Sequence, residues 1–463
     1  MPSYHSHKHW IQYRTGSGDA FYPFALWREK SNLHRLIGNW QASEDILRAN
    51  LEKALAADDE RTIALAKTDL SAMFDTRDKI EQSYVLAQEA IQHWERLNDK
   101  PGLIRAIRAK GSIHHRRSEY TQALECFSAC LDISRQTGRD NDICQILGLM
   151  GLVHFETGDL TLALRYYSDS LELSQRTNEP QFIAMAAGNT GNVYLEMDRL
   201  DEALECYQRA LKESQRAGDK QTIAFGIGNI AIIHQKKGDY QKATEWTMKQ
   251  YQSFLELGDE VHLATSLLNL GQICLDTGEL DQAIDSFTRQ IAISEKLQDK
   301  PILSYGYYLL GIVQEEKGRP GPAQKAMEQA VEVGRSIGFE KYLCGYLSRL
   351  AKFHLEQGRP ELAGAMIPEA KEIAARVSRQ DVAFDLDLLS ARLAAAENKE
   401  TSIEQLQALV PSAPDDTQKA DVLLQIYRLS GGEAYRRQAA EMFRKLYDKT
   451  PTYLYKKTLK ELT

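Results

Sequence analysis

The sequence lacks the features that define several classes of protein. No stretch of its 463 residues approaches 18 consecutive apolar residues, and the first ten, MPSYHSHKHW, contain no apolar segment like that of a signal peptide. The six cysteines form no CxxC pair, so neither a zinc ribbon nor a disulfide scaffold is indicated. With 12 prolines and 29 glycines, collagen-like and low-complexity chains are excluded as well. We therefore predict a folded cytoplasmic protein with reduced cysteines and no membrane partner.

Signatures of enzymes and of nucleic-acid binding are also missing. The sequence contains no GxxxxGK[ST], HExxH or GxSxG motif. Its net charge of −8 and pI near 5.9 argue against a nucleic-acid surface that extends over the whole chain. We therefore predict a protein that is not an enzyme, with no catalytic residues, no cofactor, no metal and no nucleic-acid partner.

A repeat of 40 residues runs through the chain without gaps. Residues 110–124 (KGSIHHRRSEYTQAL) align with 150–164 (MGLVHFETGDLTLAL), 190–204 (TGNVYLEMDRLDEAL) and 270–284 (LGQICLDTGELDQAI). Small residues let two helices approach more closely than the usual distance of about 8–10 Å, so two small columns per unit predict two helices per unit. The first column is Ser31, Ser71, Gly111, Gly151, Gly191, Ala231, Gly271, Gly311, Ala351 and Ala391, and the second is Ala123, Ala163, Ala203, Ala243, Ala283, Ala323 and Ala363.

Turn residues separate the two predicted helices of each unit. Gly158-Asp159 and Gly238-Asp239 end a first helix and begin a second, and Gly218-Asp219 ends a unit. Within the helices, apolar residues recur at i, i+3, i+4 and i+7, as they do over 200–211, and strand-like alternation is absent. The predicted fold class is therefore all-α.

These landmarks resemble the tetratricopeptide repeat (TPR) over about four-fifths of the chain. The best match is 181–220, which carries the TPR landmarks Gly191, Tyr194, Ala203, Tyr207 and Ala210. TPR units usually have about 34 residues. Units of 40 are similar to those of kinesin light chains, Pins-type proteins, bacterial Rap-type regulators and signalling-ATPase sensors. The resemblance implies a right-handed superhelix, an α-solenoid of helix-turn-helix repeats.

The repeat also predicts how the chain is divided. Residues 1–20 are expected to form a His-rich tail, and 21–380 to form nine 40-residue repeats. A degenerate repeat follows at 381–412, whose second helix is cut short before Pro411. Residues 415–463 are predicted to form a terminal helical hairpin with a capping helix over TYLYKKTLKELT, because solenoids need polar end caps.

Five histidines occupy one position of the repeat and suggest metal binding or pH sensing. Successive repeats place them about 10 Å or more apart, too far to share a metal with bonds near 2 Å. The TPR resemblance places an aromatic residue at this position, so we favour rings that fill the gap between helices. The five are His34, His114, His154, His234 and His354.

The resemblance implies that the first helix of each unit lines a concave groove. Three successive units carry asparagine at one groove-facing position, and its side chain offers the donor and acceptor that pairing with a peptide backbone requires. Phe225, Tyr305 and Tyr308 are expected to be apolar anchors. The basic side chains of Arg105, Arg108 and Arg116 are expected to bind an acidic segment of the partner. The amides predicted to contact the peptide are Asn189, Asn192, Asn229, Asn269 and Gln272.

Glycines precede these asparagines at Gly148, Gly188 and Gly228, where each costs about 1 kcal/mol of helix stability relative to alanine. Either a partner backbone comes close here or the glycines relieve crowding against the adjacent helix. The basic residues of a carboxylate clamp, as in chaperone-tail adaptors, are replaced by Gly188, Thr265 and Asn269. A chaperone C-terminus is therefore not the predicted ligand.

Our first hypothesis is a non-enzymatic scaffold or sensor that binds an extended peptide segment of a partner protein in the concave groove. The alternative is a regulatory TPR arm that controls a separate cyclase, kinase or ATPase, or that self-associates through its solenoid ends. A third reading is nucleic-acid binding by 433–463, and it is weaker. The segment's eight basic and four acidic residues are typical of a solvated face.

Overall fold

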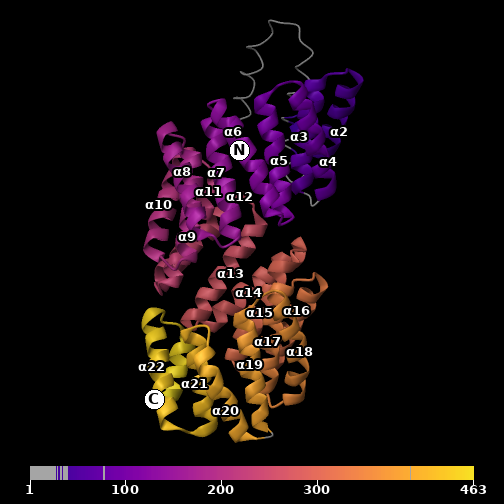
Figure 1. Ribbon diagram of the computed structural model, residues 1–463. Coiled ribbons are helices and arrows are strands. Elements are labelled where there is room, and N and C mark those ends of the chain that lie inside the picture. The colour runs from indigo at the N-terminus through magenta and orange to yellow at the C-terminus, as the bar shows by residue number, and fades with distance from the viewer. Residues whose placement is uncertain (1–27, 29, 32–33, 35–39, 77–78, 397) are drawn as a thin grey trace. The chain divides into compact units, whose positions relative to one another are not determined.

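The computed structural model describes residues 28, 30–31, 34, 40–76, 79–396 and 398–463. Within these ranges the chain is helical and contains no strand. It divides into two compact units, Met1–Val193 (unit 1) and Tyr194–Thr463 (unit 2). Figure 1 shows the consecutive helices of each unit stacked side by side. The predicted all-α solenoid is confirmed, whereas the predicted His-rich tail lies outside the described residues.

The helices follow one another with short turns between them. Unit 1 contains α2 (Trp40–Ala56), α3 (Glu60–Thr76), α4 (Ile80–Arg96), α5 (Lys100–Arg116), α6 (Tyr120–Gln136), α7 (Asp140–Glu156), α8 (Leu160–Thr177) and most of α9 (Pro180–Glu196). Unit 2 continues with α10 (Leu200–Ala217), α11 (Lys220–Lys236), α12 (Tyr240–Leu257), α13 (Glu260–Thr277), α14 (Leu280–Leu297), α15 (Lys300–Glu316), α16 (Pro320–Ser336), α17 (Glu340–Glu356), α18 (Pro360–Arg376), α19 (Gln380–Leu393), α20 (Lys399–Leu409), α21 (Asp416–Ser430), α22 (Glu433–Lys449) and α23 (Tyr453–Leu462).

Helix starts keep the 40-residue period, and an aspartate cap recurs with it at α5, α11, α13 and α15. The Asp219 carboxylate accepts hydrogen bonds from the backbone N–H groups of Gln221 and Thr222, both at 3.1 Å, and so satisfies donors at the start of α11. Gly218 ends α10 with φ +70°, a conformation that glycine adopts without steric cost. First helices begin at Lys100, Asp140, Pro180, Lys220, Glu260, Lys300 and Glu340.

Three glycines of the first small column contact an aromatic ring of the following helix, and a fourth, Gly311, contacts Met327. A Cβ atom on Gly271 would lie 2.5 Å from Cε1 of Phe287, so the ring excludes any side chain there. In the repeat 221–260, Thr247 occupies the position of the ring, and the small residue is Ala231. Rings likewise cover Gly111 (Phe127) and Gly151 (Tyr167). The second column is buried as well: its alanines are at most 1% exposed.

The histidine column lies between helices. The His154 ring stacks on Tyr166 with centroids 5.3 Å apart, and His354 is 3% exposed. Burial lowers the pKa of His234 and of His354 because it disfavours the charged ring. Among the described residues, no group of three or more His, Cys, Asp or Glu side chains could hold a metal ion.

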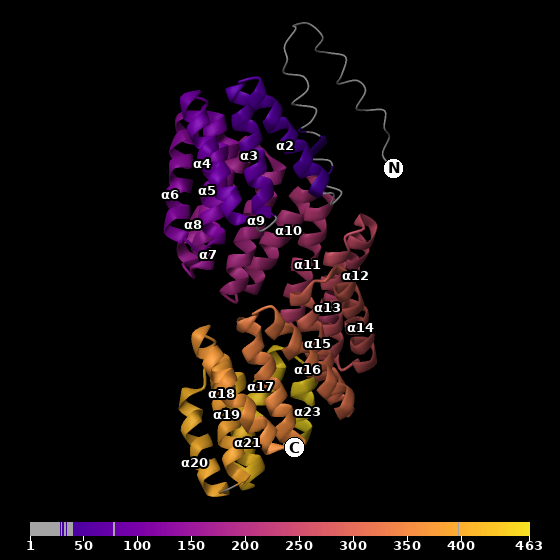
Figure 2. The same ribbon diagram turned by 90° about the vertical axis from the view of Figure 1, so that its right-hand side faces the viewer.

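The C-terminal part of unit 2 contains shorter helices. The helix α20 ends at Leu409, and Pro411 follows in a 3-10 turn (Val410–Ser412). Gly431, with φ +69°, ends α21, and α23 buries Leu462 in a cluster with Phe443. Figure 2 shows α21 and α23 at the lower end of the unit. No helix in the described ranges is long and apolar enough to span a membrane.

Candidate functional site on the inner face of unit 2

First helices of successive pairs contact one another in unit 2. The helix α13 touches α15, α17 touches α19, and α19 touches α21. Helices that meet across a repeat lie on the inner side of a curved stack, because the spacing is shortest there. We call the exposed surface of α11, α13, α15, α17, α19 and α21 the inner face of unit 2.

Four tyrosines form a cluster at the middle of this inner face, and one of them, Tyr346, is only 3% exposed and lies beneath the surface. Tyr305 and Tyr308 stack on α15 with ring centroids 5.9 Å apart. From α17, Tyr342 lies 6.3 Å from Tyr305 and Tyr346 lies 5.1 Å from Tyr308. Burial raises the pKa of Tyr346 to about 12, and also raises the pKa of Tyr305 and of Tyr308. The hydroxyls of Tyr305, Tyr308 and Tyr346 therefore stay protonated near neutral pH and can donate hydrogen bonds. These four residues are the tyrosine cluster.

Amide side chains lead up to the tyrosine cluster from α11 and α13. The Gln272 Nε2 group donates to the Tyr305 hydroxyl at 3.2 Å. Asn229 and Asn269 are half-buried, and neither side chain has a hydrogen-bond partner within the described part of the chain. Phe225 is 38% exposed, and its ring packs against that of His262 with centroids 4.7 Å apart. Unpaired amides beside exposed rings are able to bind a peptide backbone and its side chains.

Charged residues occupy the inner face beyond the tyrosine cluster. Arg349 forms an ion pair with Glu315, and Gln418 Nε2 donates to Asp385 Oδ1 at 2.8 Å. Burial raises the pKa of Glu315, of Asp385 and of Asp421, because the surrounding helices remove water from each carboxylate. The positive charge of Lys352 opposes that shift at both aspartates. This part of the face therefore holds carboxylates whose charge is only partly compensated.

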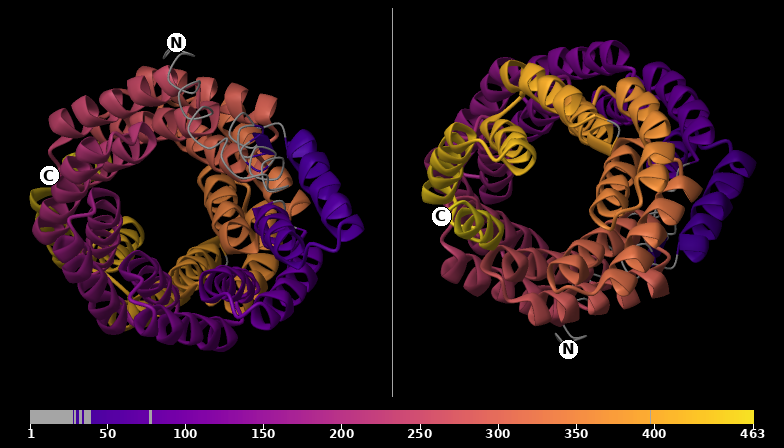
Figure 3. Two further views of the ribbon diagram at one scale, coloured as in Figure 1. Left: turned by 90° about the horizontal axis from the view of Figure 1, so that it is seen from above. Right: turned by 90° about the horizontal axis from the view of Figure 1, so that it is seen from below.

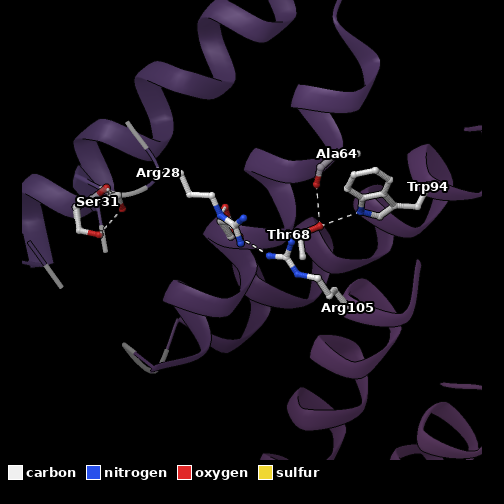
Figure 4. Close-up of polar contacts among 8 residues, drawn as sticks. Arg28, Ser31, Ala64, Thr68, Trp94 and Arg105 are labelled. Atoms are coloured by element: carbon white, nitrogen blue, oxygen red, sulfur yellow. Dashed lines mark hydrogen bonds and ion pairs between the residues drawn. The ribbon is translucent and has the colours of Figure 1, made fainter. Parts of the chain in front are cut away.

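The three predicted arginines lie in unit 1, where neighbouring helices supply partners. Arg105 Nη2 lies 2.8 Å from Asp69 Oδ1, and Arg116 lies 3.1 Å from Asp75. Arg28 also contacts Asp69, at 2.7 Å, so two guanidinium groups converge on one carboxylate. Figure 4 shows the ends of the Arg28 and Arg105 side chains close together.

Arg108 donates to Gln145, and it lines a pocket of about 200 Å³ together with Arg105, Asp69 and Asp75. Sequence reasoning found the basic residues of this pocket and missed its acidic ones. The pocket therefore carries both signs of charge, and its arginines are held by contacts within unit 1.

Two family models match the chain. The MalT-like TPR region matches residues 70–254, and the tetratricopeptide repeat matches 223–296 and 262–336. Together they span more than half of the sequence. The chain is a tetratricopeptide-repeat protein. No curated protein matches its sequence.

Solved structures resemble this TPR protein in fold. The apo quorum sensor NprR from B. thuringiensis shares 15% identity at a TM-score of 0.54, over 77% of this chain and 99% of its own. The STAND protein PH0952 from Pyrococcus horikoshii, which has a TPR sensor, shares 17% identity at a TM-score of 0.52. The match covers 74% of this chain and 50% of that protein. A Rap protein complexed with Competence and Sporulation Factor shares 11% identity at a TM-score of 0.50. The match covers 78% of this chain and 97% of the Rap protein. Identities this low establish the fold alone.

The unit boundary separates the predicted binding residues of this TPR protein. Unit 1 holds Asn189, which is half-buried, and Asn192, which is exposed, together with the three arginines. Unit 2 brings together the predicted residues Phe225, Asn229, Asn269, Gln272, Tyr305 and Tyr308. The structure therefore gathers about half of the predicted set on one inner face.

One of the glycines predicted to admit a ligand has a structural role instead. A Cβ atom on Gly228 would lie 1.9 Å from Nε2 of Gln250, whose side chain fills that space from α12. Gly148 is buried, with Met185 3.6 Å from the position of its Cβ. The space beside Gly228 is therefore occupied by a side chain of the adjacent helix, as the crowding explanation expects.

Sequence reasoning also missed residues on the inner face. Tyr342 and Tyr346 lie one turn apart on α17, a spacing that shows in the sequence. The groove-facing register, continued into 341–380, would also have found Arg349 and Lys352. The same register around Ala391 would also have found Asp385, whereas no position of the repeat identifies Asp421.

Proposed function

We propose that this TPR protein is a non-enzymatic interaction scaffold or sensor, and that the inner face of unit 2 binds an extended peptide segment of a partner. The observation that carries the proposal is the hydrogen bond between Gln272 and Tyr305, because it joins the amides of α11 and α13 to the tyrosine cluster. Backbone recognition and side-chain anchoring are thus combined on one continuous face.

The chemistry of this face suits a peptide. The side chains of Asn229 and Asn269 each offer a donor and an acceptor, which match the N–H and C=O groups of an extended strand. The rings of Phe225 and Tyr342 are 38% and 39% exposed, and burying aromatic area supplies much of the affinity of interfaces.

The carboxylates at the far end of the face support a binding role. Burial disfavours the charged forms of Asp385 and Asp421. A folded protein keeps such groups at the expense of its own stability, and this pattern is frequent at functional sites. Donors on a ligand would satisfy these oxygens and recover part of that stability.

The structural neighbours support the same proposal. The structure of the Rap protein holds Competence and Sporulation Factor, and NprR is described as a quorum sensor. Both share the solenoid fold with this chain and cover more than three-quarters of it. We propose that this protein also binds a ligand, and that the residues of the inner face of unit 2 form its binding site.

Selection of peptides from a displayed random library tests the proposal. The wild-type chain is the bait, and the selected peptides are then titrated against Tyr305→Ala and Asn269→Ala. Tyr251→Ala serves as the matched control, because Tyr251 lies on a second helix, α12, where its hydroxyl accepts a hydrogen bond from Arg289. We expect both inner-face variants to weaken binding at least about tenfold. Equal affinities for all three variants would reject this site.

The alternative, a regulatory arm of a separate signalling enzyme, makes a different prediction. The STAND neighbour combines a TPR sensor with a signalling ATPase in one chain. If this protein is such an arm, a cyclase, kinase or ATPase assay with a purified partner would change when the full chain is added. The same inner-face variants would then leave that change intact.

A further inference from the structure

The turns within successive repeats form a row in unit 2. Each turn joins the first and second helix of a pair, and the four turns lie 40 residues apart around Asp198, Gly238, Gly278 and Gly318. Because stacked repeats superimpose equivalent positions, the turns follow one another along one edge of the unit. We call these four turns the turn row.

The segment that joins α22 to α23 reaches the start of the turn row. Lys449 Nζ lies 3.1 Å from Asp198 Oδ2, and the hydroxyl of Thr450 donates to the carbonyl oxygen of Lys236 at 3.4 Å. The first pair of residues is separated by 251 positions in the sequence. In Figure 3 the yellow C-terminal helices accordingly stand beside the pink helices that begin unit 2.

Contacts continue from this point in the same order. A Cβ atom on Gly238 would lie 2.4 Å from Cδ of Pro451, and one on Gly278 would lie 2.5 Å from Cδ2 of Tyr453. Residues 449–453 therefore contact three successive turns of the row, in the same order as they occur in the chain.

The last contact is made by Lys457 in α23. Its Nζ atom lies 2.7 Å from Glu316 Oε2, beside the fourth turn of the row. The helix α23 also touches α13. Contacts at four consecutive turns indicate that the turn row is a continuous binding surface for residues 449–457.

We infer that residues 449–457 are a strap that docks on the turn row and ties the end of unit 2 to its first repeats, and that this strap opens reversibly. Closing the strap fixes the spacing of the repeats it crosses, and α11, α13 and α15 of those repeats line the inner face. Its effect on ligand entry rests on the proposed function, whereas the docking itself does not.

The nature of the contacts makes the strap reversible. The side chains of Lys449 and Asp198 are 69% and 63% exposed, so water and salt screen this ion pair. Lys457 is 55% exposed and its partner Glu316 is 14% exposed, so the second pair is open to water on the lysine side. The apolar side of α23 packs elsewhere, since Leu462 is buried in a cluster with Phe443 of α22. The strap residue Tyr455 packs in the same cluster, so the terminal hairpin can keep its own core while Lys449, Pro451, Tyr453 and Lys457 leave the turn row.

The glycines of the turns provide an experiment with matched controls. Gly278 and Gly158 both have φ +83°, but only Gly278 lies under a strap residue, and nothing lies within 4 Å of the Cβ position of Gly158. Gly238 (φ +71°) and Gly318 (φ +72°) form a second pair, in which Gly238 alone is covered. An alanine costs each pair the same backbone strain and blocks the strap at one member only.

Hydrogen exchange of the full-length chain reads out the strap. We expect Gly278→Ala and Gly238→Ala to speed amide exchange in 453–457 about tenfold, and Gly158→Ala and Gly318→Ala to leave it unchanged. Equal exchange in all four variants would overturn the inference. A variant that fails to fold shows faster exchange throughout its unit, and the charge variants below then decide the question.

Exchanging the charges of one ion pair gives the second test. Lys457→Glu should release the strap, and adding Glu316→Lys should restore slow exchange in 453–457. Failure of the double variant to recover would count against the strap. With a peptide selected on the wild type, a released strap should change the association rate. An unchanged rate would disprove the link to ligand entry, whereas a lack of any selectable peptide would contradict the proposed function and leave the exchange result standing.

Discussion

The Gln272 side chain on α13 donates a hydrogen bond to the Tyr305 hydroxyl on α15 at 3.2 Å. This contact crosses from one repeat to the next on the inner face of unit 2. It orients the Tyr305 ring, which in turn stacks on Tyr308. An amide that positions an aromatic anchor links the two kinds of recognition that we assign to this face.

Removing that hydroxyl should weaken both binding and stability. Tyr305→Phe leaves the half-buried Gln272 amide without its acceptor, so we expect a loss of about 0.5–1.5 kcal/mol in unfolding free energy. Affinity for a selected peptide should fall several-fold, because the ring loses its fixed orientation. Urea denaturation and fluorescence titration measure the two effects. Equal affinity with lower stability would mean that the contact is structural only.

The ring over the first small column should make glycine indispensable. Gly271→Ala places a Cβ atom 2.5 Å from Phe287, and overpacking of this kind costs about 1–3 kcal/mol. The double variant Gly271→Ala/Phe287→Thr copies the pair Ala231 and Thr247 found in the neighbouring unit, so it should recover part of the loss. Thermal unfolding followed by circular dichroism compares them. A neutral Gly271→Ala would show that our packing register is wrong.

Stability should respond to pH through Asp421. Burial raises its pKa in the folded state, so its ionised form destabilises that state above the unfolded pKa, and the cost disappears as pH falls through the folded pKa. Asp421→Asn should therefore raise the melting temperature at pH 7 and lose this advantage as the pH falls toward about 4.

A nearby aspartate should behave in the opposite way. Hydrogen bonds from Arg379 lower the pKa of Asp381, so its ionised form stabilises the folded state, and that stability is lost as pH falls through the lowered pKa. Asp381→Asn should therefore lower the melting temperature at pH 7. Differential scanning fluorimetry between pH 4 and 8 compares both variants with wild type. Shifts of the same sign for both would refute this assignment.

The convergence of Arg28 and Arg105 on Asp69 should matter for unit 1. Asp69 is 16% exposed in its side chain, so Asp69→Asn should cost about 1–2 kcal/mol, between the values for surface and buried pairs. Asp201→Asn is the matched control, because the Asp201 side chain is 82% exposed and its pair with Lys237 lies at the surface. We expect the control to stay within about 0.5 kcal/mol of wild type by thermal unfolding. Similar losses for both would argue against a special role for Asp69.

The sequence by itself determined the repeat, the helix pairs and their register. These follow from local interactions, such as the Asp219 cap and the closure of α10 by Gly218, and from contacts between adjacent helices, such as Gly271 with Phe287. Each of these interactions recurs with the 40-residue period, so the sequence indicates the same structure in many successive repeats. The amides and the rings of Tyr305 and Tyr308 were found by the same register.

Only the tertiary structure decided which distant residues meet. Gln250 fills the space beside Gly228, and Tyr342 and Tyr346 complete the tyrosine cluster. The strap brings Lys449 to Asp198 across 251 positions of the sequence. Such contacts depend on the small rotation between neighbouring repeats, which accumulates along the solenoid and which no single repeat encodes. The sequence therefore specified the units of this protein, and their summed geometry specified its inner face and its closure.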